Sequence, residues 1–337
     1  MLIVSSSISY ASNISKFVLD NYLLPVNTSG ARISKIVPTP VKVGLASDTS
    51  GLFKIHNNMI YLKKNKKIDS NSNAFRYGIT LIVDGNKVQF ELLKDQFSNN
   101  SIIAHRGVWR RPKVLQNSLR SFLNAVAMGC EGSEMDVWLT ADKKVILSHD
   151  PHIYGFEIEQ TSSLELFEKT IDKPDPIPSL QELLLAARQQ NTTFPVIEIK
   201  DSQLGLDRTL ELTDTVVNIV HRMKMQGYVK YISFNYEVLK RIHYLDPTAT
   251  TLYLWEGKRL LSDLVNDGIS GIDYSYYAYR QDKDLNQKAH QKNLLTNVWT
   301  VNNAQELSQY YEDGVDYITT DEPELLLKII QSHYMQE

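Results

Sequence analysis

The chain has 337 residues, of which 22% are charged, and a formal net charge of -3 at pH 7; this length suits two unequal domains better than one compact core. So small a net charge argues against nucleic acid as a partner. The single cysteine, Cys130, excludes an internal disulfide and a cysteine-based zinc site, and no apolar run approaches the roughly 18 residues of a membrane-spanning helix.

Residues 1–13 predict a signal peptide with a truncated start. The first ten residues are apolar or small, and Ser9-Tyr10-Ala11 has the character of a signal-peptidase site. No Lys or Arg precedes Lys16, so the basic segment that usually opens such a peptide is missing, and an ordinary strand is the alternative. We expect a secreted or extracytoplasmic protein, and otherwise a cytoplasmic one.

Short apolar runs that alternate with polar positions fill residues 14–97 and predict an all-β domain. The runs lie at residues 31–36, 52–55, 59–62 and 77–83. Strands at such short spacing predict a small β-sandwich. Their order resembles a single cadherin-like repeat. The acidic linkers that bind calcium in that family are missing, so we assign no site to this domain, and its partner is unknown.

A short polar segment, residues 95–100, marks the boundary with a second domain, residues 98–337, where strand and helix patterns alternate. Strand-like runs lie at residues 102–105, 133–138, 145–149, 195–200, 231–234, 251–255, 271–274, 294–301 and 316–320. Helical spacing lies at residues 118–128, 179–188, 207–225, 236–244, 304–313 and 322–333. About eight β/α units predict an α/β fold, a (β/α)8 TIM barrel. A doubly wound sheet is the alternative, but charged residues at the ends of several strands favour the barrel.

Three carboxylates are expected to meet at one end of this barrel. Glu134 and Asp136 lie two apart on one strand and so point to the same side, and Glu198 lies on the next barrel strand, two residues before Lys200. Unpaired carboxylates at one opening would repel and raise each other's pKa. A hard divalent cation such as Ca²⁺ or Mg²⁺ relieves this repulsion. The alternative is a network of ion pairs with Lys200 and Arg106.

His105 and His149 each end a strand-like run, next to Arg106 and Asp150. A lone histidine is more often structural than catalytic, but two of them near a carboxylate cluster suit the cleavage of a phosphodiester. Breaking a P–O bond needs a base on one side and an acid at the leaving alkoxide. It also needs positive charge at the non-bridging oxygens, which a metal, Arg106 and Lys200 would supply.

Short motifs run in order through residues 101–335. They are His105-Arg106-Gly107, Asn117-Ser118, Glu134-x-Asp136, His149-Asp150, Glu198-x-Lys200, Trp299-Thr300-Val301-Asn302 and Thr320-Asp321-x-Pro323. In this set the chain resembles the glycerophosphodiester phosphodiesterase family. The resemblance implies a (β/α)8 barrel that hydrolyses a small-molecule glycerophosphodiester to glycerol 3-phosphate and an alcohol, with one divalent cation, Ca²⁺ or Mg²⁺. In that family the substrate's own neighbouring hydroxyl is thought to attack phosphorus.

On matching positions the resemblance also implies roles for individual residues. It implies His105 and His149 as the acid–base pair, Glu134, Asp136 and Glu198 as metal ligands, Arg106 and Lys200 as phosphate contacts, and Trp299 as part of the substrate pocket.

Two other functions are compatible with the sequence. A phospholipase C-like or D-like enzyme would act on intact lipid and would need an apolar rim that faces a membrane surface. A catalytically silent barrel would serve as a binding module, for which Gln116 is the main support. Both histidines, three carboxylates and Lys200 are retained, which argues against the silent barrel.

The family usually has Glu-Asn-Thr where this chain has Gln116-Asn117-Ser118, and that glutamate is a metal ligand. The neutral carbonyl oxygen of Gln116 can coordinate a cation, but with one negative charge fewer. We therefore expect calorimetric titration to show weak cation binding, suited to millimolar extracellular calcium. A submicromolar affinity would contradict this prediction.

Overall fold

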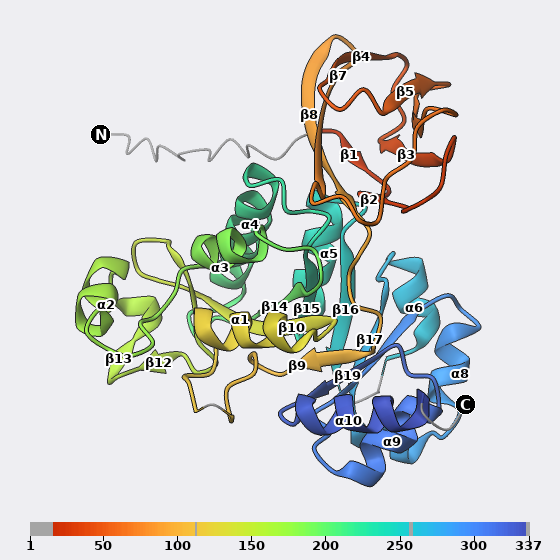
Figure 1. The fold of residues 1–337 in the computed structure, drawn as a ribbon. Helices are drawn as coiled ribbons and strands as arrows, with labels where there is room; N and C mark the ends of the chain where they lie inside the picture. The colour runs from red at the N-terminus through yellow and green to blue at the C-terminus, as the bar shows by residue number, and fades with distance from the viewer. Residues whose placement is uncertain (1–15, 112, 256–258, 335–337) are drawn as a thin grey trace, which may run out of the picture.

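The structure, a computed structural model, describes residues 16–111, 113–255 and 259–334. Figure 1 shows a small β domain at one end of a larger α/β domain. The predicted signal peptide at residues 1–13 lies outside the described residues. Across the described ranges, no helix combines the length and the apolar character needed to traverse a bilayer.

The β domain consists of two four-stranded sheets, as the period-two patterns predict. One sheet has the order β1 (Val18–Leu19), β3 (Arg32–Val37), β6 (Met59–Leu62), β5 (Phe53–His56). The other has the order β2 (Leu23–Leu24), β8 (Asn86–Lys94), β7 (Arg76–Val83), β4 (Val43–Asp48). Phe53, Ile60 and Leu81 are fully buried in the apolar cluster of this domain. Its cadherin-like identity stays a prediction.

The larger domain is a closed barrel of parallel strands. In order around the barrel they are β9 (Ile102–Ala104), β10 (Gly132–Leu139), β14 (Phe194–Ile199), β15 (Lys230–Ser233), β16 (Thr250–Trp255), β17 (Gly271–Ser275), β18 (Leu295–Trp299) and β19 (Tyr317–Thr320). The first strand, β9, pairs with both β10 and β19, and these two pairings close the sheet. This closure confirms the TIM barrel and excludes the doubly wound alternative. The run at residues 145–149 forms β11 (Val145–Leu147), which pairs antiparallel with β10 outside the closed ring.

All six predicted helices form within a few residues of their predicted bounds. They are α1 (Leu119–Met128), α3 (Leu180–Ala187), α4 (Leu206–Arg222), α5 (Tyr236–Leu245), α9 (Ala304–Glu312) and α10 (Pro323–Tyr334). Side-chain caps explain where they begin: Ser118 accepts a hydrogen bond from the Ser121 backbone N–H, and Ser179 accepts one from Glu182.

Four short helices were not predicted from the sequence. They are α2 (Ser163–Thr170), α6 (Leu261–Asn266), α7 (Tyr276–Gln281) and α8 (Leu285–His290). Helices of six to eight residues span about two turns, too few for a 3.6-residue period to stand out. The first of them follows a small hairpin of β12 (His152–Ile153) and β13 (Phe156–Glu157) and the 3₁₀ turn η1 (Ile158–Gln160), and together these project to the left in Figure 1.

The interior of the barrel changes from apolar to polar along the strands. Alternate positions of neighbouring strands contribute an apolar cluster of Ile103, Phe194, Val196, Ile232, Leu252 and Leu254. Because side chains alternate along a strand, the next inward positions after Val196 and Ile232 are Glu198 and Phe234. The carboxyl ends of the strands therefore place ionisable side chains above a packed base, as in other barrels of this type.

The β domain packs against the opposite, amino-terminal end of the barrel. Arg188, which follows α3, forms a charged hydrogen bond with Glu91 of β8. The Asn191 side-chain amide donates to the backbone carbonyl of Lys94 at 2.9 Å, and Lys224 Nζ donates to Gln89 Oε1 at 2.9 Å. These contacts fix the sheet of β7 and β8 to the barrel.

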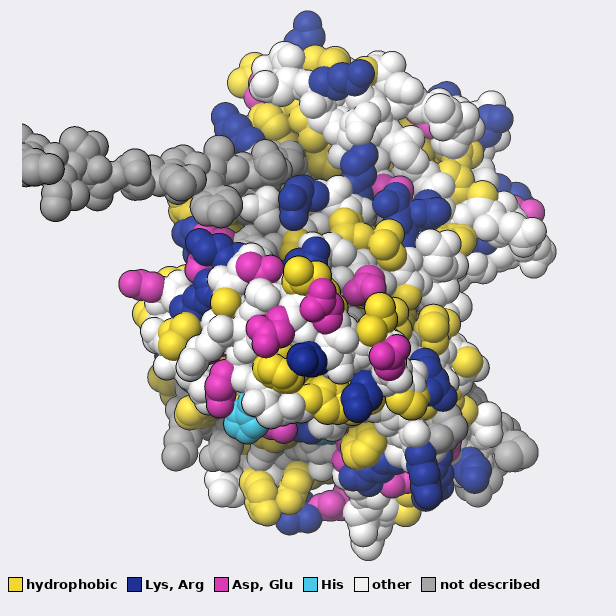
Figure 2. Space-filling view, turned by 90° about the vertical axis from the view of Figure 1, so that its left-hand side faces the viewer, with side chains coloured by type: hydrophobic (Ala, Val, Ile, Leu, Met, Phe, Trp, Pro, Cys, Tyr) yellow, Lys and Arg dark blue, Asp and Glu magenta, His cyan; other side chains and the backbone are white. Residues whose placement is uncertain are grey.

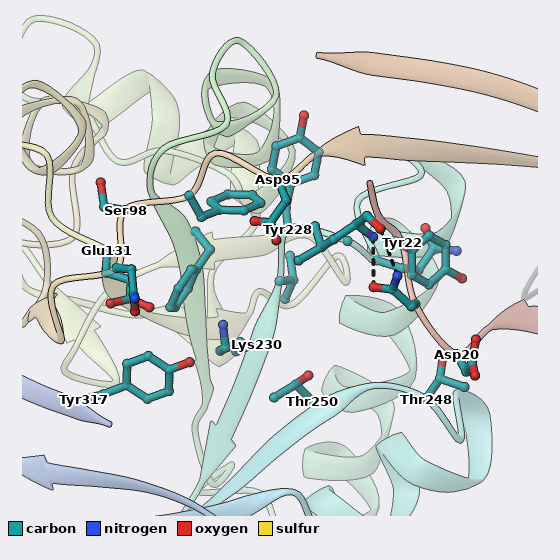
Figure 3. Close-up of a pocket in the computed structure, with 18 residues that line it drawn as sticks. Asp20, Tyr22, Asp95, Ser98, Glu131, Tyr228, Lys230, Thr248, Thr250 and Tyr317 are labelled. Atoms are coloured by element: carbon teal, nitrogen blue, oxygen red, sulfur yellow. Dashed lines mark hydrogen bonds between the residues drawn. The ribbon is translucent and has the colours of Figure 1, made fainter. Parts of the chain in front are cut away.

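A cavity of about 560 Å³ lies at this junction, far along the strands from their carboxyl ends. Figure 3 shows Tyr22 of the β domain toward one end of it and Tyr317 of the barrel toward the other, with Lys230 between them. The Lys230 ammonium lies 3.3 Å from the centre of the Phe194 ring, a cation–π contact. The apolar interior of the barrel thus separates this cavity from the predicted cluster of Glu134, Asp136 and Glu198.

We expect Arg188→Ala to destabilise the protein by about 1–3 kcal/mol, because it leaves the largely buried Glu91 carboxylate without its charged partner. Thermal unfolding measures the loss, and limited proteolysis within residues 95–100 reports loosening of the junction. The matched control is Arg280→Ala, which removes a more exposed ion pair with Glu306 and should lower the unfolding temperature less than Arg188→Ala does. Equal unfolding temperatures for Arg188→Ala and wild type would contradict the prediction.

Candidate active site

The three predicted carboxylates meet at the carboxyl end of the barrel. Asp136 of β10 and Glu198 of β14 are register partners on neighbouring strands, and Glu134 lies two residues before Asp136. Each residue offers one oxygen, and these three oxygens lie within 4.8 Å of one another. The exposed fractions of Glu134, Asp136 and Glu198 are only 3%, 1% and 7%. Bulk water therefore cannot solvate their charges.

Positive groups of the protein compensate this cluster in part. Lys200 Nζ lies 2.7 Å from Glu198 Oε1 and 3.1 Å from Asp136 Oδ1. Arg106 Nε lies 3.8 Å from Asp136 Oδ2. The ion-pair network considered from the sequence is therefore present, yet it places two cationic side chains against three carboxylates.

Glu134 is the carboxylate that the network leaves incomplete. Its Oε2 accepts a hydrogen bond of 2.9 Å from the Arg106 backbone N–H. Its Oε1 is buried and has no hydrogen-bond partner among the described residues. A buried oxygen without a donor is costly, and three converging carboxylate oxygens suit a hard divalent cation. The donor set of this cluster thus fits such an ion.

The same crowding shifts the pKa values of the cluster in opposite directions. Burial, together with Asp136 and Glu198, raises the pKa of Glu134 well above its usual value. Burial and Asp136 raise the pKa of Glu198 to about 8. Burial would also raise the pKa of Asp136, but Lys200, His149 and Asn117 outweigh it and hold that pKa below its usual value. Without a cation the site therefore retains protons that a bound ion would displace.

A tight turn after β9 positions Arg106 against the cluster. Arg106 and Gly107 have φ angles of 57° and 79°, in the left-handed region. A Cβ atom on Gly107 would lie 2.5 Å from Ser121 Oγ, so only glycine fits between this turn and α1. The turn aims the Arg106 N–H at Glu134 and leaves its guanidinium at the edge of the pocket.

Asn117 orients Asp136 from the next loop. Its side-chain Nδ2 donates to Asp136 Oδ2 at 2.7 Å, and its Oδ1 accepts from the Asp136 backbone N–H at 2.9 Å. The preceding residue, Gln116, accepts a hydrogen bond of 3.0 Å from Arg106 Nη1. The structure thus shows Gln116 as a support for the Arg106 guanidinium, and its role as a metal ligand stays a prediction.

Both predicted histidines line the same cavity, which has a volume of about 150 Å³. His105 Nδ1 lies 2.8 Å from Asp321 Oδ1, and His149 Nδ1 lies 2.8 Å from Asp150 Oδ1. These carboxylates engage Nδ1 and so leave Nε2 of each ring available for chemistry. Burial, with the nearby Lys200 and Arg106, lowers the pKa of His149 despite the opposing charge of Asp136.

Two residues behind His105 were not identified from the sequence as parts of the site. Arg110 Nη2 donates to Asp321 Oδ2 at 2.7 Å, and Asn302 Nδ2 donates to the same oxygen at 2.9 Å. Burial opposes ionisation of Asp321, but its contacts with His105, Asn302 and Arg110 lower its pKa. These side chains therefore fix a charged Asp321 behind the imidazole. In the sequence, Asp321 and Asn302 are marked only by their membership of two matching motifs.

The other wall of the cavity is mostly apolar. Trp299 lines it, with its ring 5.6 Å from that of Phe234 in an edge-to-face contact, and its contact with substrate stays a prediction. Ile232 and Leu254 complete the apolar surface. Among the described residues that form this wall, Asp273 is the carboxylate, and burial raises its pKa to about 7. The sequence does not single it out, because it lies within an ordinary strand-like run.

Comparisons with known proteins agree with this geometry. The model of the glycerophosphoryl diester phosphodiesterase family matches residues 105–325. A glycerophosphodiester phosphodiesterase of Bacillus subtilis is 24% identical over 253 residues, which cover 67% of this chain and 85% of that protein. The match to the family model lies within the barrel and leaves the β domain outside.

Solved structures show the same barrel. A glycerophosphodiester phosphodiesterase from Parabacteroides distasonis is 32% identical, with a TM-score of 0.67 over 71% of this chain and 99% of its own. An Oleispira antarctica phosphodiesterase, solved in complex with the product sn-glycerol-3-phosphate, is 19% identical, with a TM-score of 0.60 over 68% of this chain and 96% of its own. The second likeness concerns the fold alone.

We expect the Glu198→Gln variant to gain stability relative to wild type as the pH rises, when both are measured in EDTA. Folded Glu198 keeps its proton up to about pH 8, whereas the unfolded chain releases it near the ordinary pKa of 4.5. The stability that this proton gives is full below the unfolded pKa and is lost as the pH rises through the folded pKa. Glutamine has no proton to lose.

The measurement is the difference in unfolding temperature between variant and wild type at several pH values from about 5 to about 8. The difference should move steadily in favour of Glu198→Gln. Glu168→Gln, at an exposed position, is the control and should show a flat difference. A pH-independent difference for Glu198→Gln would mean that the carboxyl is not held protonated.

Proposed function

The chain belongs to the glycerophosphoryl diester phosphodiesterase family, and we propose that its barrel hydrolyses soluble glycerophosphodiesters to glycerol 3-phosphate and an alcohol. The observation that supports this most is one cavity lined by His105, His149, Arg106 and Lys200 beside the carboxylate cluster. That set contains the acid, the base and the positive charge that cleavage of a phosphodiester requires.

Glu134, Asp136 and Glu198 would hold one divalent cation, Ca²⁺ or Mg²⁺. The unpartnered Oε1 of Glu134 and the raised pKa of two of the three carboxyls support this assignment. When bound, the ion supplies positive charge to the phosphate oxygens. Lys200 and the Arg106 guanidinium, which border the same cavity, would contact the remaining non-bridging oxygens.

The two imidazoles would divide the proton transfers. Neutral His149, whose pKa is lowered by burial, suits the base that takes the proton from the attacking hydroxyl of the substrate. His105, whose Nδ1 lies 2.8 Å from Asp321 Oδ1, suits the acid that protonates the leaving alkoxide, because this contact leaves its Nε2 available to donate a proton. Attack by the substrate hydroxyl would release the alcohol and leave a cyclic phosphodiester of the glycerol. Water would then open this ring, with the proton transfers reversed.

We propose a small molecule rather than nucleic acid as the partner, from the charge distribution on one face of the barrel. Figure 2 shows Lys and Arg side chains interspersed with Asp and Glu side chains over the barrel on one face of the molecule. A nucleic-acid site would instead gather basic side chains in a continuous stripe. The formal net charge of -3 agrees with this.

We expect wild-type protein to release glycerol 3-phosphate from glycerophosphocholine when Ca²⁺ or Mg²⁺ is supplied, and to lose this activity in EDTA. His105→Ala and His149→Ala should each lower kcat by about 10²- to 10⁴-fold, because each removes one proton-transfer group. His152→Ala, at an exposed position three residues after His149, is the matched control and should retain the wild-type rate. Equal rates in all variants, with and without EDTA, would instead favour the silent binding module.

A further inference from the structure

Asp273 occupies an unusual position on the apolar wall of the cavity. It is the central residue of β17, only 1% exposed, between its register partners Leu254 on β16 and Asn297 on β18. Asn297 Nδ2 donates to its Oδ1 at 2.8 Å. Within the part of the chain that the structure describes, no Lys, Arg or His pairs with Asp273, and its Oδ2 accepts no hydrogen bond.

The surroundings of Asp273 are held rigidly. Asn297 also contacts Thr319 Oγ1 at 2.8 Å, and Trp299 Nε1 donates to the Asp273 backbone carbonyl at 2.9 Å. The carboxyl is thus oriented by neighbours on β18 and β19, yet one of its oxygens is left for the cavity. A hydrogen-bond donor on a ligand in this cavity can therefore pair with that oxygen.

The position of Asp273 in the cavity indicates which ligand group this is. The phosphate-binding side chains Arg106 and Lys200 belong to one side, whereas Asp273 lies among Phe234, Leu254 and Trp299 on strands β15 to β18. A three-carbon glycerol chain can pack on this apolar surface while its phosphate faces the cations. Its middle hydroxyl is the one expected to attack phosphorus, which leaves only the terminal hydroxyl without a partner.

We infer that Asp273 accepts a hydrogen bond from the free terminal hydroxyl of the substrate's glycerol, and so selects deacylated glycerophosphodiesters over acylated ones. This inference rests on the proposed function. A fatty acyl ester at that position removes the donor and adds a chain that a cavity of about 150 Å³ in the barrel interior does not accommodate. A site built to hydrogen-bond a substrate hydroxyl strongly rejects an analogue without it, because its own buried polar group is left unpaired.

The test compares two soluble substrates that differ only at the terminal hydroxyl. Glycerophosphocholine has it, whereas 2-hydroxypropyl phosphocholine lacks it but keeps the hydroxyl next to the phosphate. Wild type should prefer glycerophosphocholine by about 10²-fold or more in kcat/KM. Asp273→Ala should lose most of this preference by losing activity toward glycerophosphocholine alone. Asp273→Asn keeps the size and one acceptor oxygen, so its preference should lie between those of the other two.

The outcomes separate this inference from the proposed function. If wild type hydrolyses neither substrate with Ca²⁺ or Mg²⁺, the proposed function itself fails. If it hydrolyses both substrates, or glycerophosphocholine and lysophosphatidylcholine, at equal kcat/KM, only the role of Asp273 is overturned. An equal loss on both substrates in Asp273→Ala and Asp273→Asn would show a structural role instead. Asp316→Asn, at the position just before β19 and outside the cavity of Asp273, is the control and should keep the wild-type preference.

Discussion

The site depends on one electrostatic constraint: three carboxylates are buried together with too little positive charge. Lys200 and Arg106 approach Asp136 and Glu198, but one oxygen of Glu134 has no partner among the described residues. Proteins rarely bury such groups unless a ligand completes them, because the desolvation cost is not repaid. Proton uptake by the glutamates reduces the repulsion in the cluster, and the proposed divalent cation would replace those protons.

The architecture explains how this crowding is tolerated. Residues near the carboxyl ends of β10 and β14 and after β9 meet there because the strands are parallel and the sheet closes. Below them, an apolar cluster that includes Val196, Ile232 and Leu252 fills the barrel, and the β domain packs against the far end. The packing that stabilises the barrel and the residues proposed for chemistry therefore lie at opposite ends of the same strands. The carboxylate cluster rests on the packed apolar residues.

Much of this could be predicted from the sequence, because local rules govern it. Period-two alternation placed Glu134 and Asp136 on one side of a strand, and short motifs located both histidines. What could not be predicted involves partners far apart in the chain or elements too short to show a period. Arg110 and Asp321 are 211 positions apart, Asp273 looks like any residue of its strand, and α6 to α8 are only six residues each. The hydrogen bond from Arg106 to Gln116 likewise depends on how two loops fold together, and no motif indicates it.

The central claim is that Glu134, Asp136 and Glu198 together bind one cation, and anomalous diffraction from crystals soaked in Mn²⁺ tests it most directly. The account predicts a single strong anomalous peak within coordinating distance of all three carboxylates, which disappears in Glu134→Gln. A strong peak elsewhere in the molecule, or none at millimolar Mn²⁺, would contradict it.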